Sequence, residues 1–310
     1  MIGVFSVTVI LRMKQLFTKQ FNITVVITII LSLVGFLLLS KRLEEFGYTT
    51  FIITPVCIGY FIGQRPGRKI NLVFALLFGI IAFFVFLFTM GLEFLFCIIL
   101  VSPIIIVGMY IGTAIGYWLR QKVNGARKSN NLKLSILPLL VLLFAGTFEH
   151  YFMGKYDYLK VQTSIYLPYG AGKVYDYIKS VDTLNTDKPF LLHLGLPIPE
   201  KCILSKEAVG AERTCYFEEG KIDERVTALK RGEYLKMNVT GYTVPLPKWL
   251  TFNEAIYLFK AKDTGTVLTR ITTYRTELKP RFYWRFWEVK AIEAEHEYVL
   301  EDLKRRLKER

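Results

Sequence analysis

Residues 253–310 decide the fold predicted for the C-terminal half: NEAIYLFKAK (253–262), DTG (263–265), TVLTRITTYRT (266–276), ELKP (277–280) and RFYWRFWEVKAIEAEHEYVLEDLKRRLKER (281–310). The first and third segments are rich in β-branched and aromatic residues, and the Asp-Thr-Gly between them is typical of a hairpin turn. The last segment predicts one long helix, because its apolar residues recur at helical spacing and form one stripe: Val289, Ile292, Val299, Leu303 and Leu307.

The chain before this hairpin adds further strands. Residues 161–167 alternate polar and apolar as a strand does, and 173–181 have helical spacing. After an irregular segment, short strands are predicted at 201–206, 212–217, 221–229 and 234–239. The order predicts an α+β helix-grip domain, in which a curved antiparallel sheet wraps around the long C-terminal helix and can leave a cavity between them.

The N-terminal half has a different composition. The whole chain of 310 residues is 52% hydrophobic and 15% aromatic, but residues 1–150 hold only 13 of its 40 Lys and Arg and 4 of its 26 Asp and Glu. Such a chain is neither one compact soluble globule nor a disordered protein. The net charge of +14 does not indicate nucleic-acid binding, because the basic residues lie in short loops or among acids rather than in one patch.

Five apolar runs predict an α-helical bundle of about five transmembrane spans, since a span needs about 20 residues. The runs cover residues 21–40, 46–64, 71–92, 94–119 and 134–149, and they place a transmembrane domain at 1–150, a tether at 151–160 and the helix-grip domain at 161–310. In the fourth run, Gly108, Gly112 and Gly116 share one helix face. They either permit close helix contact or reflect how common glycine is in membrane helices.

Charge in the loops predicts the orientation in a plasma (inner) membrane. The N-terminal arm and the loops at 65–69 and 120–133 are basic, which places them in the cytoplasm and the C-terminal domain outside it. Runs two and five are the weakest, and the loss of one would reverse the side of that domain. The spans carry essentially no charged residue, which argues against a pump or a proton-coupled transporter.

Several stretches of the C-terminal half carry a family resemblance. LPYGAGKVYDYI (167–178) matches an entry into a first helix and VGAERTCYFEEGKIDERV (209–226) a central hairpin. Over about residues 160–308 the chain resembles the START/Bet v1-like superfamily, also called SRPBCC or polyketide cyclase/dehydrase and lipid transport. The resemblance implies a helix-grip fold and leaves ligand and reaction open, because this fold hosts carriers and enzymes.

A bacterial subgroup of that superfamily, attached to membranes, is similar in further residues. These are TTYR (272–275), YWRFW (283–287), His296 with Val299-Leu300, and Glu93, Cys97 and Pro103 in the fourth run.

The long helix supplies the candidate ligand-binding residues Tyr283, Trp284, Trp287, Ile292 and His296. His296 is also the candidate catalytic residue, as a ligand partner or general acid/base, and the alternative is a core histidine satisfied by a neighbour. The aromatic residues at the start of the helix could gate a cavity, contact lipid headgroups or pack in the core.

Two cysteines form the other candidate feature. The midpoint of Cys202 and Cys215 falls at the turn predicted near Ala208–Gly210, so the two would face each other across a hairpin. A disulfide is allowed outside the cytoplasm, and two reduced buried cysteines are the alternative. A zinc site is not predicted, because no paired His stands at ligand spacing. The acids Glu218, Glu219, Asp223 and Glu224 are interpreted as a solvated face.

The function predicted is membrane-anchored binding of a hydrophobic small molecule or lipid, with no cofactor, metal or nucleic acid and with the lipid bilayer as a partner. Two alternatives stay open: a cyclase or dehydratase that uses His296 in the same cavity, and a sensor or assembly subunit that binds a protein.

Overall fold

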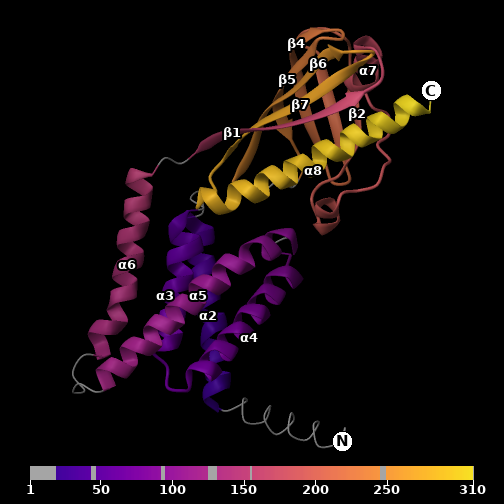
Figure 1. Ribbon diagram of the computed structural model, residues 1–310. Helices are drawn as coiled ribbons and strands as arrows, with labels where there is room; N and C mark the ends of the chain where they lie inside the picture. Colours follow the sequence, from indigo (N-terminus) through magenta and orange to yellow (C-terminus); the bar gives the residue numbers. More distant parts are fainter. Residues whose placement is uncertain are drawn as a thin grey trace, which may run out of the picture. The chain divides into compact units, whose positions relative to one another are not determined.

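The computed structural model describes residues 19–42, 47–91, 95–124, 131–153, 156–244 and 249–309, and the chain divides into two compact units between Lys155 and Tyr156 (Figure 1). The first unit is helical. Its described elements are α2 (Lys19–Arg42), the π-helical turn η1 (Thr49–Ile53), α3 (Thr54–Gly63), α4 (Lys69–Thr89), α5 (Leu95–Asn124) and α6 (Asn131–Phe152). Glu93, at the fourth predicted run, lies outside the described residues.

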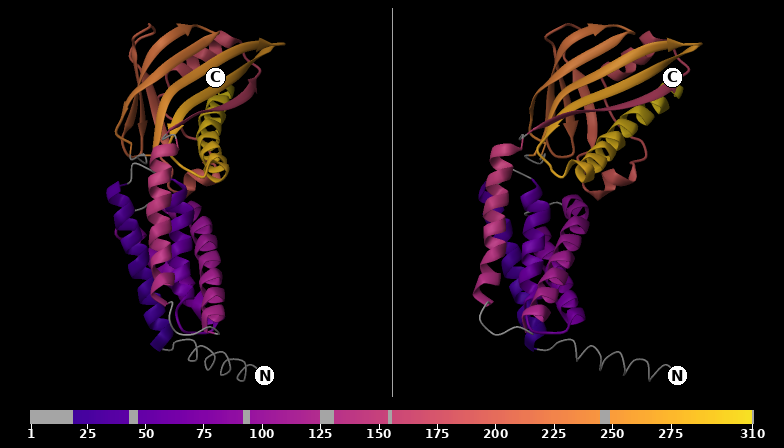
Figure 2. Two further views of the ribbon diagram at one scale, coloured as in Figure 1. Left: turned by 90° about the vertical axis from the view of Figure 1, so that its left-hand side faces the viewer. Right: turned by 60° about the vertical axis from the view of Figure 1, so that its left-hand side comes forward.

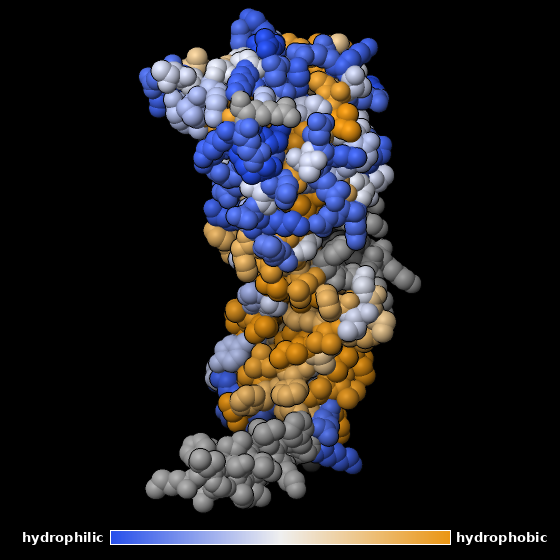
Figure 3. Space-filling view, turned by 90° about the vertical axis from the view of Figure 1, so that its right-hand side faces the viewer, coloured by the Kyte–Doolittle hydropathy of each residue, from blue (hydrophilic) through white to orange (hydrophobic). Residues whose placement is uncertain are grey.

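Two helices of the described chain are long and apolar enough to cross a membrane, Lys69–Thr89 and Leu95–Lys122. The prediction of about five spans is not met by this criterion. The second predicted run is divided between η1 and the ten-residue α3, and the first and fifth are apolar over the shorter stretches Lys19–Val34 and Leu140–Phe152. Hydrophobic side chains cover the visible surface of this unit, whereas that of the second unit is mostly hydrophilic (Figure 3).

Small residues bring α3 and α5 into close contact. A Cβ built on Gly112 would lie 2.0 Å from the carbonyl oxygen of Val56, and one on Gly116 would lie 2.3 Å from that of Tyr60. On α3, a Cβ built on Gly59 would lie 2.0 Å from the carbonyl oxygen of Met109 on α5. These glycines are therefore required by the approach of the two backbones, which confirms the first of the two readings of the glycine spacing.

The second unit contains a seven-stranded antiparallel sheet in the order β1-β7-β6-β5-β4-β3-β2. The strands are β1 (Asp157–Leu167), β2 (Pro199–Leu204), β3 (Glu212–Phe217), β4 (Lys221–Lys230), β5 (Tyr234–Tyr242), β6 (Leu250–Lys262) and β7 (Gly265–Thr276). The helices are α7 (Ala171–Lys179), the 3-10 turn η2 (Phe190–Leu194) and α8 (Arg281–Lys308).

The sheet is curled and α8 lies along its inner side (Figures 1 and 2). This arrangement confirms the predicted helix-grip fold, and every predicted strand is present. The predicted tether is too long, however. Helix α6 continues to Phe152, and β1 begins at Asp157, which pairs with Thr276 of β7.

Two apolar clusters fill the space between the sheet and α8. The larger one lies toward α7 and includes Leu167, Leu268 and Leu303. The smaller one consists of Val161, Tyr274 and Ile292, with partly buried neighbours Leu159, Leu250, Phe252 and Val289. The second cluster is the smaller of the two and lies nearer the start of α8.

Candidate functional site

A layer of polar side chains separates the two apolar clusters. Along the inner face of β7, Arg270 and Thr272 stand between Leu268 of the larger cluster and Tyr274 of the smaller one. Along β1, Thr163 stands between the two clusters in the same way, as do Glu295 and His296 on α8. We call this layer, together with the polar groups that extend it into the larger cluster, the polar belt; it comprises Thr163, Arg213, Glu224, Tyr257, Arg270, Thr272, Glu295 and His296.

His296 is fully buried in the belt and held by two threonines. Its Nε2 lies 2.8 Å from Thr272 Oγ1 and its Nδ1 lies 3.0 Å from Thr163 Oγ1. Burial, helped by the positive charge of Arg270, lowers the pKa of His296 to about 2. The imidazole is therefore neutral at physiological pH, and both of its nitrogens already have hydroxyl partners. This geometry fits a core histidine satisfied by its neighbours better than a general base that receives a proton from a substrate.

Two ion pairs form the rest of the belt. Arg213 Nη1 donates to Glu224 Oε2 at 2.6 Å, and both side chains are buried. Arg270 lies 2.8 Å from Glu295, in a partly buried pair. The ring of Tyr257 is close to both cations, with Arg213 Cζ 5.9 Å and Arg270 Cζ 5.6 Å from its centroid.

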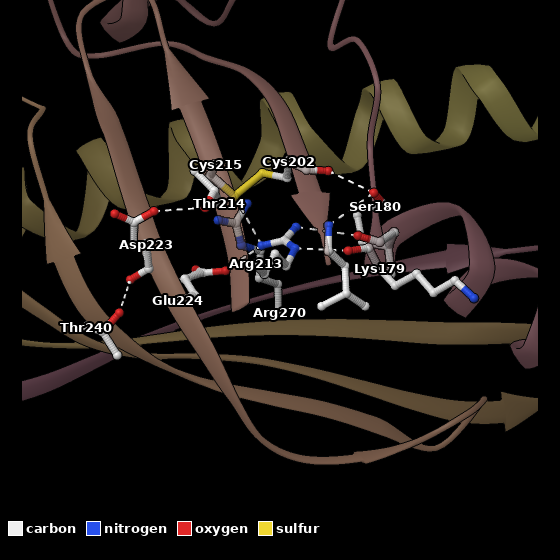
Figure 4. Close-up of polar contacts among 12 residues, drawn as sticks. Lys179, Ser180, Cys202, Arg213, Thr214, Cys215, Asp223, Glu224, Thr240 and Arg270 are labelled. Carbon is white, nitrogen blue, oxygen red and sulfur yellow. Dashed lines mark hydrogen bonds and ion pairs between the residues drawn. A yellow bond between two sulfur atoms is a disulfide. The ribbon is translucent and has the colours of Figure 1, made fainter. Parts of the chain in front are cut away.

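The cysteines border the same region. Cys202 and Cys215 lie directly opposite each other on β2 and β3, 4.0 Å apart at Cα, and are joined by a disulfide (Figure 4). Arg213 Nη1 lies 3.2 Å from Cys215 Sγ, and Arg213 Nε donates to the carbonyl oxygen of Lys179 at 3.0 Å. The disulfide thus fixes β2 next to the strand that carries Arg213. This is the pairing that the positions of the two cysteines predicted.

A groove opens where β5 and β6 separate. Their pairing ends at Asn238 with Glu254, although β5 continues along β4 and β6 continues along β7. A register shift between Phe252 and Glu254 bends β6 at this point. The groove is lined by residues from both faces of the sheet: Tyr158, Leu159, Lys160, Asn238, Val239, Asn253, Glu254, Thr273 and Tyr274. Tyr274 belongs to the smaller apolar cluster and Leu159 packs against it, so the groove borders that cluster.

The start of α8 holds a second charged network. Glu288 is buried and accepts hydrogen bonds from Tyr274 Oη at 3.1 Å and Thr276 Oγ1 at 2.7 Å. Arg281 pairs with the same carboxylate at 2.9 Å. These contacts fasten the first turns of α8 to the end of β7 and make Glu288 a structural anchor of the helix.

The predicted ligand-binding residues separate into two groups. Trp284, Ile292 and His296 are buried and face the sheet, whereas Tyr283 and Trp287 are half-buried. The most exposed aromatic side chains of this helix are Phe282 and Phe286, at 79% and 56% exposure. Ile292 and His296, one helical turn apart, are therefore neighbours in the interior, and Tyr283 and Trp287 are partly open to solvent.

The arginines and carboxylates of the belt were missed by the sequence reasoning. Glu224 was interpreted as part of a solvated face and is 6% exposed, because it lies in the same strand phase as the buried Val226 and meets Arg213. No local signal in the sequence marks Arg270 as buried, because both faces of β7 carry polar residues. Within the described parts of the chain, no three His, Cys, Asp or Glu side chains come together to hold a metal ion.

Comparison with known proteins gives no match to a family model and none to a curated protein. Solved structures do match about half of this chain. DynU16, from the dynemicin biosynthetic locus, is 16% identical over 48% of this chain and 47% of its own, with a TM-score of 0.33. The chain thus spans about half the length of that protein.

Two further structures are similar over nearly their whole length. Ara h 8.0201 is 13% identical over 47% of this chain and 99% of its own, with a TM-score of 0.30. The major latex-like protein 151 of Panax ginseng is 11% identical over 49% and 98%, with a TM-score of 0.34.

Proposed function

We propose that this chain is a membrane-attached protein whose C-terminal helix-grip domain binds a hydrophobic small molecule or lipid. The observation that carries the proposal is the groove between β5 and β6, which shares Leu159 and Tyr274 with the smaller apolar cluster. A ligand entering there would meet the smaller apolar cluster before the larger one near α7. Each CH₂ group that it buries would contribute about 0.8 kcal/mol.

The outward face of the helical unit supports membrane attachment. On α4, Phe78, Ile81 and Val85 are each more than half exposed, and α5 shows a similar face. A water-soluble protein rarely exposes so much contiguous apolar surface. We propose that α4 and α5 cross the plasma (inner) membrane, with the remaining apolar helices of the predicted five beside them.

The disulfide between Cys202 and Cys215 favours an extracytoplasmic position for the helix-grip domain, because disulfides persist in oxidising compartments. This is the side that the loop charges predict. Attachment to the bilayer would keep the groove close to a membrane source of ligand and raise its effective concentration there.

An enzyme is the weaker candidate. His296 is neutral, fully buried and bonded to two threonines, so it has no free nitrogen to offer a substrate. A binding role requires apolar surface and access, and the contact of the groove with Leu159 and Tyr274 supports it.

Native mass spectrometry of the full chain, released from micelles after incubation with a membrane lipid extract, tests the proposal. We expect a defined adduct on the wild type and its loss in Val239→Trp, because the indole would fill the groove. Val209→Trp is the matched control, since Val209 is 65% exposed in a turn away from the groove. A bare wild-type mass, under conditions that load a known lipid-binding protein, would contradict the proposal, as would an adduct that Val239→Trp retains in full.

A further inference from the structure

Arg270 has hydrogen-bonding capacity that the protein does not use. Only its Nη2 meets Glu295, at 3.0 Å from Oε1 and 2.8 Å from Oε2. The Nε and Nη1 atoms are buried and have no hydrogen-bond partner. The side chain as a whole is 11% exposed, so water has little access to them. Buried donors without an acceptor are costly, and those of a guanidinium especially so.

The groups around Arg270 do not supply that acceptor. Tyr257 presents its ring, and the neighbouring Glu224 is bonded to Arg213. His296 is occupied by its two threonines. The polar belt therefore contains two arginines and two carboxylates, and the unused donors lie on Arg270.

The position of Arg270 is also suited to a ligand. It lies on the inner face of β7, four residues from Tyr274, which lines the groove and belongs to the smaller apolar cluster. At a rise of about 3.3 Å per residue, the two positions are roughly 13 Å apart along the strand. A chain-like molecule that entered through the groove would cross the apolar cluster and reach the belt with its far end.

We propose that the ligand of the helix-grip domain is amphipathic and anionic, and that Arg270 binds its carboxylate or phosphate head group through the nitrogens that Glu295 leaves free. The proposal rests on the proposed binding function and specifies its ligand class. Guanidinium groups bind both kinds of oxyanion by charge-assisted hydrogen bonds, so the chemistry is shared by fatty acids and by alkyl phosphates.

The test compares three probes of equal chain length on the full chain at pH 7.5: dodecanoate, dodecyl phosphate and the uncharged dodecanol. Bound fractions are measured by native mass spectrometry. We expect the wild type to prefer an anionic probe over dodecanol by roughly tenfold to a hundredfold. The two anionic probes then distinguish a carboxylate from a phosphate ligand.

Variants separate the head-group contact from folding. Arg270→Gln alone would leave Glu295 buried without its cation, so the double variant Arg270→Gln/Glu295→Gln is used. It should keep its binding of dodecanol and lose the preference for anions. Glu295→Gln alone should strengthen anion binding, because it removes the competing carboxylate. The matched control neutralises the exposed pair Arg225 and Glu212, 3.8 Å apart, and should change nothing.

The outcomes distinguish the two proposals. If none of the three probes binds the wild type, the proposed binding function is contradicted. If dodecanol binds as tightly as both anions, or the double variant retains the anion preference, a hydrophobic ligand site stands and the role of Arg270 is contradicted.

Discussion

Replacing His296 by Gln should remove much of the acid sensitivity of the helix-grip domain. The imidazole is fully buried between Thr163 and Thr272, and burial together with Arg270 lowers its pKa to about 2. In the unfolded chain a histidine has a pKa of about 6.5. Below that value the unfolded state therefore binds a proton that the folded state excludes.

The sign and size of the effect follow from this difference. Because the folded pKa is depressed, stability is fully present above pH 6.5 and is lost progressively as the pH falls toward 2. Between pH 7 and pH 5 the free energy of unfolding should fall by about 2 kcal/mol through this group. For a unit of this size the loss corresponds to about 4–8 °C in the unfolding midpoint.

The assay is thermal unfolding of the full chain in micelles at pH 7 and pH 5, followed by circular dichroism of the sheet. Carboxylates that titrate in this range affect all variants alike, so the informative quantity is the difference between the two midpoints. We expect that difference to be smaller in His296→Gln than in the wild type. His193→Gln, the same change at an exposed histidine of η2, should behave as the wild type does. An equal midpoint loss in His296→Gln and wild type would refute the reasoning.

Three further changes test contacts inside the helical unit or inside the helix-grip domain. Replacing both Cys202 and Cys215 by Ser should lower the free energy of unfolding of the helix-grip domain by about 3 kcal/mol, as measured by urea titration; an unchanged midpoint would show that the bridge adds no stability. Gly112→Ala should lower the thermal stability of the helical unit, because its Cβ would lie 2.0 Å from a backbone oxygen. Gly146→Ala is the control and should leave the midpoint unchanged, because the nearest atom is 4.0 Å away. Equal midpoints for the two variants would contradict the close helix contact. Glu224→Gln should cost roughly 3 kcal/mol in the same urea titration, since it leaves a buried guanidinium without its anion, and a loss near zero would mean that water reaches the pair.

The sequence alone predicts most of the helix-grip fold because its elements are bounded by local signals. The Asp-Thr-Gly turn, the alternation in residues 266–276 and the apolar stripe from Val289 to Leu307 each depend on neighbours in the chain. The positions of Cys202 and Cys215 also predict a contact between two strands. In a hairpin, residues at equal distances from the turn lie opposite each other, and the two cysteines do so on β2 and β3.

The polar belt was beyond such reasoning. In β7 both strand phases carry polar residues, so alternation does not reveal that Arg270 and Thr272 point inward. Burial of Glu224 depends on Arg213, a residue of the neighbouring strand. The break in the second apolar run was missed for a related reason. The run changes helix type at Thr54, where η1 passes into α3, and composition does not indicate this break.

The most direct test of the central claim is the mass of whatever the full chain already carries when it is purified from the membranes in which it is made. Native mass spectrometry without added lipid, followed by solvent extraction, would measure it. We predict one lipophilic molecule at near-stoichiometric occupancy on the wild type and on Val209→Trp, and its absence from Val239→Trp. A wild-type chain that carries no molecule and takes up none from a lipid extract would contradict a ligand-binding role for the groove between β5 and β6.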